Sequence, residues 1–356
     1  MIRTTVASLI FVVFVSHAFG DVSISKLGSP VQQARAEKWN REHASRSQPN
    51  WNVKRPFSEI ERTGYVVTNS DDAYEMDDLR RAIAQNLPDG VTFVLYVRGK
   101  WMVDGLRQRY GGALGDRLKF VTVPDYGNSV WGRDSLPFPV ILNSKEGDRG
   151  VFGLVGSIYP QEFDPNDSVA GALSLPMMKT QKYFRGGNLL FDLEGNCFAE
   201  EANELTWMGD PTAFLTDYFG CATVTLLPHR GGIGDIDERL KLLEGKKAIT
   251  DDDSYEQVLR SKGYEVFRVP PTGMAFETYM NTLLVNGTLF VPQMGLESDS
   301  RAVAAYEQLG FKTVPVYTKQ LADQGKGNIH CVTMNYPEGA FVPSPLGRDF
   351  LEFNIH

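Results

Sequence analysis

The chain of 356 residues has few of the groups on which many functional sites depend, since it contains only three cysteines and five histidines. Three cysteines are too few for a scaffold held together by disulfides. The formal net charge of −8 argues against a nucleic-acid partner. After residue 20 no apolar run is long enough for a transmembrane helix. These absences disfavour disulfide-rich, nucleic-acid-binding and membrane-spanning proteins.

Phosphate, dinucleotide and metal sites are not indicated either. The glycine runs do not lie between a strand and a helix as phosphate-binding and dinucleotide-binding loops require. The acidic run 251–253 precedes a predicted helix and is typical of an N-terminal cap. We therefore expect neither a cofactor nor a metal ion.

Residues 1–20 have the pattern of a cleavable signal peptide. Arg3 supplies a positive charge, residues 6–15 are almost wholly apolar, and Ala18-Phe19-Gly20 offers small residues for cleavage. We expect a secreted or periplasmic protein without membrane attachment after cleavage, although a retained N-terminal anchor is an alternative. The polar stretch 21–56 is predicted to be an arm or linker.

Export would also affect the cysteines. In an oxidising compartment Cys197 and Cys221 can pair, which would leave Cys331 as an unpaired thiol. Cys331 follows two glycines and a histidine in the segment 325–333. Glycines let the backbone approach a ligand, and a thiol beside polar groups can be held as a reactive thiolate. The alternative is a buried structural cysteine.

From residue 57 onward the chain repeats one pattern. Predicted hairpins turn at Gly147, Gly195, Gly245 and Gly287, which lie 42 to 50 residues apart. Helices are expected at 210–218, 254–262 and 300–309, each followed by a strand, at 222–227, 264–269 and 312–316. The N-terminal part offers strands at 64–68, 91–97 and 118–123 and helices at 76–86 and 102–110.

The final strand, predicted at 331–334, has no helix after it and can pair with the N-terminal strands. The pattern therefore predicts one α/β domain, residues 57–356, built as a closed ring of about five ββαβ units. In such a ring the loops that follow equivalent strands gather at one end of the axis. We expect Asp134, Asp237, Asn281 and Cys331 to converge there.

Four motifs in this order resemble those of the agmatine deiminase and bacterial peptidylarginine deiminase family. They are Trp131-Gly132-Arg133-Asp134-Ser135-Leu136-Pro137, Gly186-Gly187-Asn188, Gly234-Asp235-Ile236-Asp237 and the segment from Gly325 to Thr333. The resemblance runs from about residue 57 to the end. It implies the pentein fold, a five-bladed α/β propeller with pseudo-five-fold symmetry, and a hydrolase that converts a guanidino group to a ureido group and ammonia.

The chemistry of such a site follows from the guanidinium itself, a planar cation with five N–H donors. Carboxylates bind it through charge-assisted hydrogen bonds, and a thiolate can attack its central carbon. The resemblance implies that Cys331 is the nucleophile and that Asp134 and Asp237 are guanidinium-binding carboxylates. It further implies that Trp131, Asn188, Asn281 and His330 line or shape the site.

One position departs from the family pattern. The family has Gly-His-x-Asp, with the histidine as proton shuttle, where this chain has Asp235. An unperturbed Asp is ionised at neutral pH and has no proton to donate. Asp235 could still act as the acid if neighbouring carboxylates raise its pKa, and His229 is a possible substitute. Leu136, in place of a usual glycine, is a smaller departure.

The substrate is expected to be a small guanidino compound or an arginine-containing peptide. Arg185 and Arg230 could bind a substrate carboxylate, which peptidylarginine or arginine could require and agmatine lacks. A pentein that binds a guanidinium or cationic peptide without catalysis remains the main alternative. An amidinotransferase, which would use the same covalent intermediate, is a third reading. The sequence does not determine the oligomeric state.

Overall fold

The computed structural model describes residues 53–122, 130–143, 151–156, 177–179, 184–201, 210–273 and 276–338. The predicted signal peptide, and the predicted arm as far as residue 52, lie outside these ranges and stay predictions. The described part is mixed α/β, and its strands form five small sheets. Within it, no helix has the length and apolar character needed to cross a bilayer.

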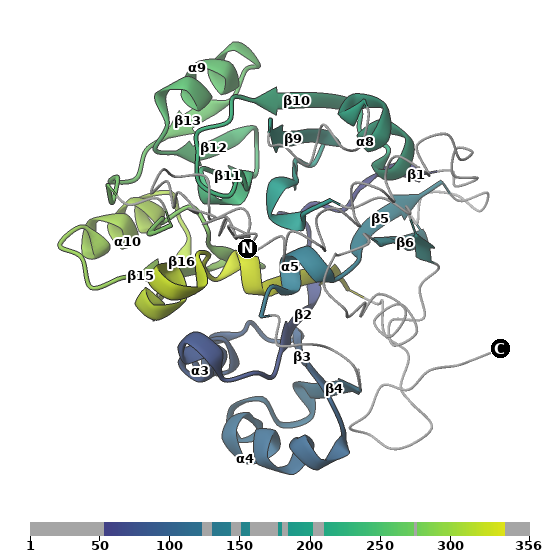
Figure 1. Cartoon of the computed structure of the whole chain (residues 1–356), viewed down its shortest axis with the longest axis vertical. Coiled ribbons are helices and arrows are strands. Elements are labelled where there is room, and N and C mark those ends of the chain that lie inside the picture. The colour runs from purple at the N-terminus through teal and green to yellow at the C-terminus, as the bar shows by residue number, and fades with distance from the viewer. Residues whose placement is uncertain are drawn as a thin grey trace, which may run out of the picture.

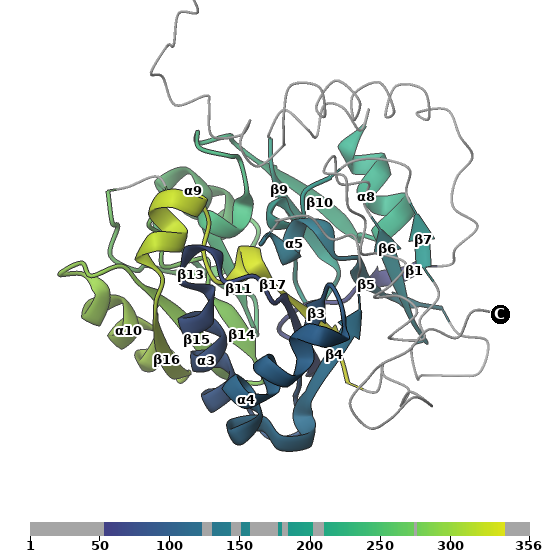
Figure 2. The same cartoon turned by 60° about the horizontal axis from the view of Figure 1, so that its bottom comes forward.

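One sheet joins the two ends of the described chain. Its strands, in order, are β17 (Thr333–Pro337), β2 (Thr63–Asn69), β3 (Thr92–Val97) and β4 (Leu118–Thr122). β17 is antiparallel to β2, whereas β2, β3 and β4 are parallel and are connected through α3 (Met76–Asn86) and α4 (Val103–Leu114). In Figure 2 the yellow β17 is seen close to β3 and β4, and β2 lies between β17 and β3 in this sheet. The predicted pairing of the last strand with N-terminal strands is confirmed.

Three consecutive units repeat a hairpin, a helix and a strand that returns parallel to the second hairpin strand. The first contains β8 (Leu190–Phe191), β9 (Asn196–Glu200), α8 (Pro211–Phe219) and β10 (Thr223–Leu227). The second contains β11 (Leu240–Leu243), β12 (Lys247–Thr250), α9 (Asp253–Ser261) and β13 (Glu265–Phe267). The third contains β14 (Leu283–Val285), β15 (Thr288–Gln293), α10 (Asp299–Gln308) and β16 (Lys312–Tyr317). These elements confirm the predicted units.

Local sequence explains where these elements begin and turn. Asn286 and Gly287 both have positive φ, of 47° and 82°, which suits a two-residue hairpin turn. The Asp210 carboxylate accepts the N–H groups of Thr212 and Ala213, and Pro211 opens α8. The predicted acidic cap of α9 is also confirmed, because Asp252 accepts the N–H groups of Ser254 and Tyr255.

The fifth sheet corrects the boundary of the folded region. It contains β1 (Val53–Pro56), β5 (Phe138–Leu142), β6 (Val151–Gly156) and β7 (Met177–Lys179). β1 pairs antiparallel with β5, although residues 53–56 fall in the predicted arm. An edge strand is held through its backbone, so polar side chains such as Lys54 do not prevent it. The folded region therefore begins no later than Val53.

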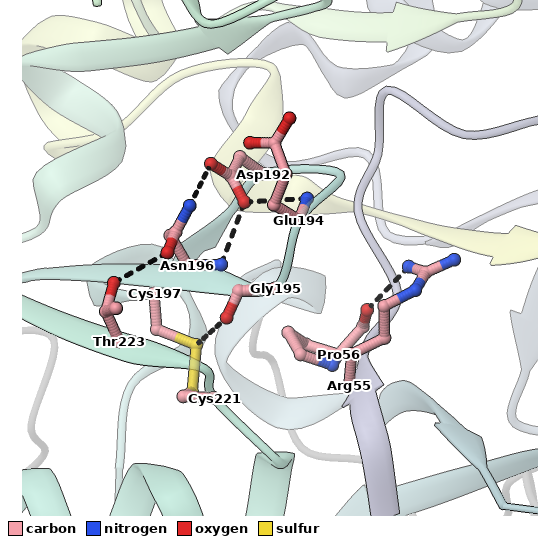
Figure 3. Close-up of a disulfide and its surroundings, with 9 residues drawn as sticks. All are labelled: Arg55, Pro56, Asp192, Glu194, Gly195, Asn196, Cys197, Cys221 and Thr223. Carbon is pink, nitrogen blue, oxygen red and sulfur yellow. Dashed lines mark hydrogen bonds between the residues drawn. A yellow bond between two sulfur atoms is a disulfide. The ribbon is translucent and has the colours of Figure 1, made fainter. Parts of the chain in front are cut away.

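The helices α3, α4, α8, α9 and α10 lie toward the outside in Figure 1, whereas the short helix α5 (Gly132–Ser135) lies near the middle. Close to α8, Cys197 on β9 and Cys221 form a disulfide that joins residues 24 positions apart. Figure 3 shows it next to the turn at Gly195, where the Asp192 carboxylate accepts the N–H groups of Glu194 and Asn196. This pairing leaves Cys331 outside any disulfide.

Short helical turns complete the described elements. They are η1 (Ala73–Glu75), η2 (Lys100–Met102), η3 (Gly115–Arg117), η4 (Gly186–Asn188), η5 (Ile236–Glu238), η6 (Leu321–Gly325) and η7 (His330–Val332). Cys331 lies in η7, so the predicted strand at 331–334 begins two residues later than expected, at Thr333. Such a turn ends the regular backbone pairing and lets the Cys331 side chain be positioned separately from the strand.

Candidate active site

Four short turns, α5, η4, η5 and η7, carry most of the predicted site residues, and glycines allow them to pack closely. A Cβ on Gly186 would lie 2.0 Å from the carbonyl oxygen of Arg133, and one on Gly132 would lie 2.8 Å from that of Val332. No other residue type fits at either position without a shift of the backbone. The glycines of the motifs therefore serve to bring the turns together.

The Cys331 thiol is buried and held by Asn281. The Nδ2 group of Asn281 lies 3.1 Å from Sγ, while its Oδ1 accepts the Cys331 N–H at 3.2 Å. An amide N–H that faces sulfur favours the thiolate over the thiol. Asn281 therefore contacts the predicted nucleophile directly.

Asp237 lies on the other side of the sulfur. Its two carboxylate oxygens are 3.6 and 3.9 Å from Sγ, and its Oδ2 is 2.7 Å from Nδ1 of His330. The other ring nitrogen of His330 is 3.1 Å from the Glu59 carboxylate. All three side chains are nearly inaccessible to solvent. The thiol and Asp237 are thus parts of one buried polar network that includes His330.

Asp235 also reaches the thiol. One oxygen of Asp235, one of Asp237 and Sγ of Cys331 all lie within 4.8 Å of one another. Carboxylates and thiolates can also be ligands of a metal ion. Asp235, however, already has a positively charged partner, because Nη1 of Arg185 lies 3.2 Å from its Oδ1. The expectation that the protein uses no metal stays a prediction.

Arg185 lies inside the fold, and its predicted contact with a substrate carboxylate is not tested. Its side chain has no accessible surface, pairs with Asp235 and donates to the carbonyl oxygen of Ile233. This guanidinium is therefore engaged by Asp235 in the structure. No local pattern indicates this pairing, because Arg185 and Asp235 are brought together only by the packing of η4 against η5.

Asp134 and Asp235 lie on either side of the Gly187 backbone. The Asp134 carboxylate accepts the Gly187 N–H at 3.0 Å, and a Cβ on Gly187 would lie 2.9 Å from Oδ2 of Asp235. Both aspartates are buried. The structure therefore places Asp134 next to the Asp235 side of the site, and its contact with a substrate stays a prediction.

Trp131 and Asn188 help to shape the site. A Cβ on Gly327 would lie 2.6 Å from the Trp131 ring and 3.2 Å from Sγ of Cys331, so ring and sulfur approach the same glycine. The amide of Asn188 is bonded on both sides to the backbone of Glu200, at 2.9 and 2.7 Å. Asn188 therefore braces its turn, and its predicted ligand contact is not tested.

His229 and Arg230 have other partners. Nδ1 of His229 lies 2.6 Å from the Glu200 carboxylate, and 44% of its side chain is exposed. Arg230 pairs with Asp252 and is 49% exposed. These contacts give neither residue a position beside Cys331. His330, by contrast, lies in the buried network between Asp237 and Glu59.

Three buried charges in the network had no recognised role in the sequence: Glu59, Lys241 and Arg133. Lys241 is 2.6 Å from the Glu59 carboxylate and 2.8 Å from the carbonyl oxygen of Thr282. Burial alone would raise the pKa of Glu59, but the nearby Lys241 ammonium and His330 outweigh it and hold that pKa well below its usual range. No local sequence pattern marks these residues, because their burial and their partners are determined by the tertiary structure.

Comparisons with known proteins agree with the geometry. Residues 248–337 match the sequence profile of the Porphyromonas-type peptidyl-arginine deiminases. A provisionally named agmatine deiminase of Vibrio parahaemolyticus is 25% identical over 287 residues, which cover 62% of this chain and 78% of that protein. These matches confirm the resemblance to the Porphyromonas-type peptidyl-arginine deiminase and agmatine deiminase family.

Two further relatives of this deiminase family show the extent of the similarity. A provisionally named agmatine deiminase of Streptococcus mutans is 34% identical over 96 residues, a segment that spans 26% of each protein. The solved agmatine deiminase of Enterococcus faecalis superposes with a TM-score of 0.65 at 19% identity, covering 81% of this chain and 96% of that one. At that identity the superposition shows the fold alone.

Proposed function

We propose that this protein is a member of the deiminase family and a cysteine-dependent hydrolase that converts a guanidino group to a ureido group and ammonia. The observation that carries the proposal is the position of Cys331 Sγ, 3.1 Å from Nδ2 of Asn281 and 3.6 Å from Asp237. A donor stabilises the nucleophile, and a carboxylate lies where it can bind the cation under attack.

The reaction would proceed in two balanced steps. The Cys331 thiolate forms a bond to the central carbon, the bond from that carbon to one nitrogen breaks, and the nitrogen takes a proton and leaves as ammonia. Water then attacks the thiouronium carbon and loses both of its protons, one to the group that protonated the leaving nitrogen and one to the released ammonia. The carbon–sulfur bond breaks to restore the thiolate. The net change is guanidinium plus water to urea plus ammonium.

The proton for ammonia would come from His330 and not from Asp235. The ion pair with Arg185 uses Asp235 in its ionised form, which carries no proton. His330 contacts Asp237 at 2.7 Å, and Asp237 is the carboxylate next to the sulfur. This arrangement gives the site a proton-carrying group despite the departure at position 235.

The substrate class is a guanidino compound, with peptidylarginine, arginine and agmatine as the three candidates. Arg185 is buried and paired with Asp235, and this pairing does not favour a substrate that carries a carboxylate over agmatine. Arg230 pairs with Asp252. The choice among the three therefore depends on direct assay with each compound.

We also propose that the protein is exported, to a secreted or periplasmic location, and that its five sheets form a closed pentein propeller. Export is supported by the signal-like pattern of residues 1–20 and by the Cys197–Cys221 disulfide, a bond typical of oxidising compartments. Closure is supported by the pairing of β17 with β2. Thiol titration of unreduced protein should find one reactive thiol; finding three would weaken the case for export.

Assays of ammonia and of the ureido product test the proposal, with peptidylarginine, arginine and agmatine as substrates. The protein should turn over at least one of them, and Cys331→Ala should reduce the rate by at least a thousandfold while leaving Tm within a few degrees. Measurable binding without turnover of any of the three would contradict the enzyme proposal.

A binding protein without catalysis is the second candidate, and the buried Arg185–Asp235 pair favours it. A permanent positive charge beside Asp235 competes with a guanidinium substrate for that carboxylate. Asp235→His distinguishes the two candidates when combined with Arg185→Gln, which removes the charge that Asp235 now balances. A large gain in rate over an inactive parent would identify the native protein as impaired. A loss from an active parent would show that the pair belongs to a working site.

A further inference from the structure

We propose that Glu59, held ionised by Lys241, is a positioning residue that keeps the His330 ring charged beside Asp237 and so keeps the Cys331 thiol reactive. The inference rests on the proposed function for its catalytic meaning. Its physical claim concerns the thiol alone and can be measured without a substrate.

The contacts form one continuous path. Cys331 Sγ is 3.6 Å from Asp237, Asp237 is 2.7 Å from Nδ1 of His330, and Nε2 of His330 is 3.1 Å from Glu59. The other oxygen of Glu59 is 2.6 Å from Nζ of Lys241. Glu59 and Lys241 lie 182 positions apart in sequence, and Glu59 and His330 lie 271 apart. Each residue in the path is buried or nearly so.

The two carboxylates around His330 determine its charge. An ionised carboxylate has no hydrogen to donate, so each ring nitrogen forms its hydrogen bond only if it carries a proton. With Glu59 on one nitrogen and Asp237 on the other, the ring is fully bonded only as the imidazolium. Lys241 prevents Glu59 from being an uncompensated buried charge.

The charge of His330 matters to the sulfur through Asp237. A carboxylate 3.6 Å from sulfur disfavours the thiolate by like-charge repulsion, and Asp235 adds to this repulsion. An imidazolium on Asp237 offsets the first carboxylate, as Arg185 offsets the second. Without Glu59 the imidazolium would lose one of the two carboxylate hydrogen bonds that favour its charged form.

Other charged groups around His330 do not replace Glu59. Arg133, from α5, approaches the backbone of His330 with its Nε 3.4 Å from the carbonyl oxygen, and its burial lowers its own pKa. Lys241, from β11, reaches His330 only through Glu59. Both are cations and disfavour a charged ring. Among the described contacts, the two carboxylates are the groups that favour it.

The test is the rate at which iodoacetamide alkylates Cys331 as a function of pH, in the intact protein with its disulfide oxidised. Glu59→Gln should raise the apparent pKa of the thiol by about one unit, which corresponds to a rate about tenfold lower near neutral pH. The matched control is Glu61→Gln, which removes the same charge two positions away. Glu61 pairs with Arg55 and not with His330 or Lys241 in the described contacts. The control variant should alkylate within twofold of the native rate.

A folded Glu59→Gln protein with an unchanged pH profile would overturn the proposal. If that variant does not fold because Lys241 is left unpaired, Glu59→Gln combined with Lys241→Met decides, and the same rise in the thiol pKa is expected. Failure of both variants to fold would assign the pair to stability and reject the positioning role. Native protein with this pH behaviour but no turnover would refute the proposed function and leave this inference standing.

Discussion

The candidate site has two halves that carry neighbouring aspartates but balance them differently. In the thiol half, Asp237 lies between Cys331 and the titratable ring of His330. In the arginine half, Asp235 pairs with the buried guanidinium of Arg185, which stays protonated at any ordinary pH. A fixed charge can hold a site in shape but cannot exchange protons. Proton exchange is therefore expected in the thiol half of the proposed site.

The largest expected effect is that of removing the charge at Asp237. Asp237→Asn should lower kcat/KM for the substrate by about a thousandfold, or ~4 kcal/mol, because it weakens both guanidinium binding and the contact with His330. Steady-state ammonia release measures this, with Tm as the check on folding. Asp235→Asn should affect Tm more and activity less. Equal losses of activity in the two variants would break the distinction between the halves.

The arginine half should show its role in stability. Arg185→Met leaves Asp235 buried without its counter-charge and should lower the free energy of unfolding by about 3–5 kcal/mol. Urea is the appropriate denaturant, because guanidinium can itself bind the site. Arg185→Met combined with Asp235→Leu should recover much of the loss. The control is Arg230→Met, whose half-exposed pair with Asp252 should contribute less than about 1 kcal/mol.

Asn281 and Asn188 separate the two roles that an amide can have near this site. Asn281→Ala removes the donor 3.1 Å from sulfur and should reduce the alkylation rate of Cys331 about tenfold at neutral pH. Asn188→Ala removes the brace on Glu200 and should lower Tm while leaving the alkylation rate of the folded protein within twofold. The reverse pattern would show that the contacts have been assigned to the wrong residue.

The smallest effect concerns stability in acid. The pKa of Glu59 is held below its ordinary value of 4.5, so its contribution to stability is present above that pH and is lost as the pH falls further. Between pH 4.5 and 3, the native protein should lose free energy of unfolding more steeply than Glu59→Gln, by up to about 1.4 kcal/mol per pH unit. Urea titrations at several pH values measure the two slopes. Parallel slopes would contradict the ionised, compensated state of Glu59.

Much of the fold could be predicted because its signals are local. Turn residues such as Asn286-Gly287 mark the hairpins, and apolar periodicity marks the helices, with α3 found at its observed bounds, Met76–Asn86. The boundary near Val53 was missed, since an edge strand formed by polar residues has no such signal. The strand assigned to Cys331 began too early, because a helical turn of three residues leaves no periodic pattern.

The site was predictable to the extent that motifs mark it. Motifs identified Cys331, Asp134, Asp235 and Asp237, and the spacing after the repeated strands identified Asn281. The structure brings these residues together with His330 or with the turns around it. Their catalytic roles stay predictions. Arg185 was assigned to substrate, and Glu59 and Lys241 were not considered. The roles of these residues depend on the contacts between buried charges. Glu59 contacts Lys241 across 182 positions and His330 across 271, and only the complete fold determines such contacts.

The most direct test of the account is a comparison of two alkylating agents of the same shape, chloroacetamidine, a planar cation, and chloroacetamide, its neutral counterpart. If the thiol half binds a guanidinium-like cation against Asp237, chloroacetamidine should modify Cys331 at least tenfold faster, and Asp237→Asn should abolish the preference. Intact mass and peptide mapping measure the rates at the single unpaired cysteine. Equal rates for the two reagents, or a faster reaction with the neutral one, would contradict the central claim.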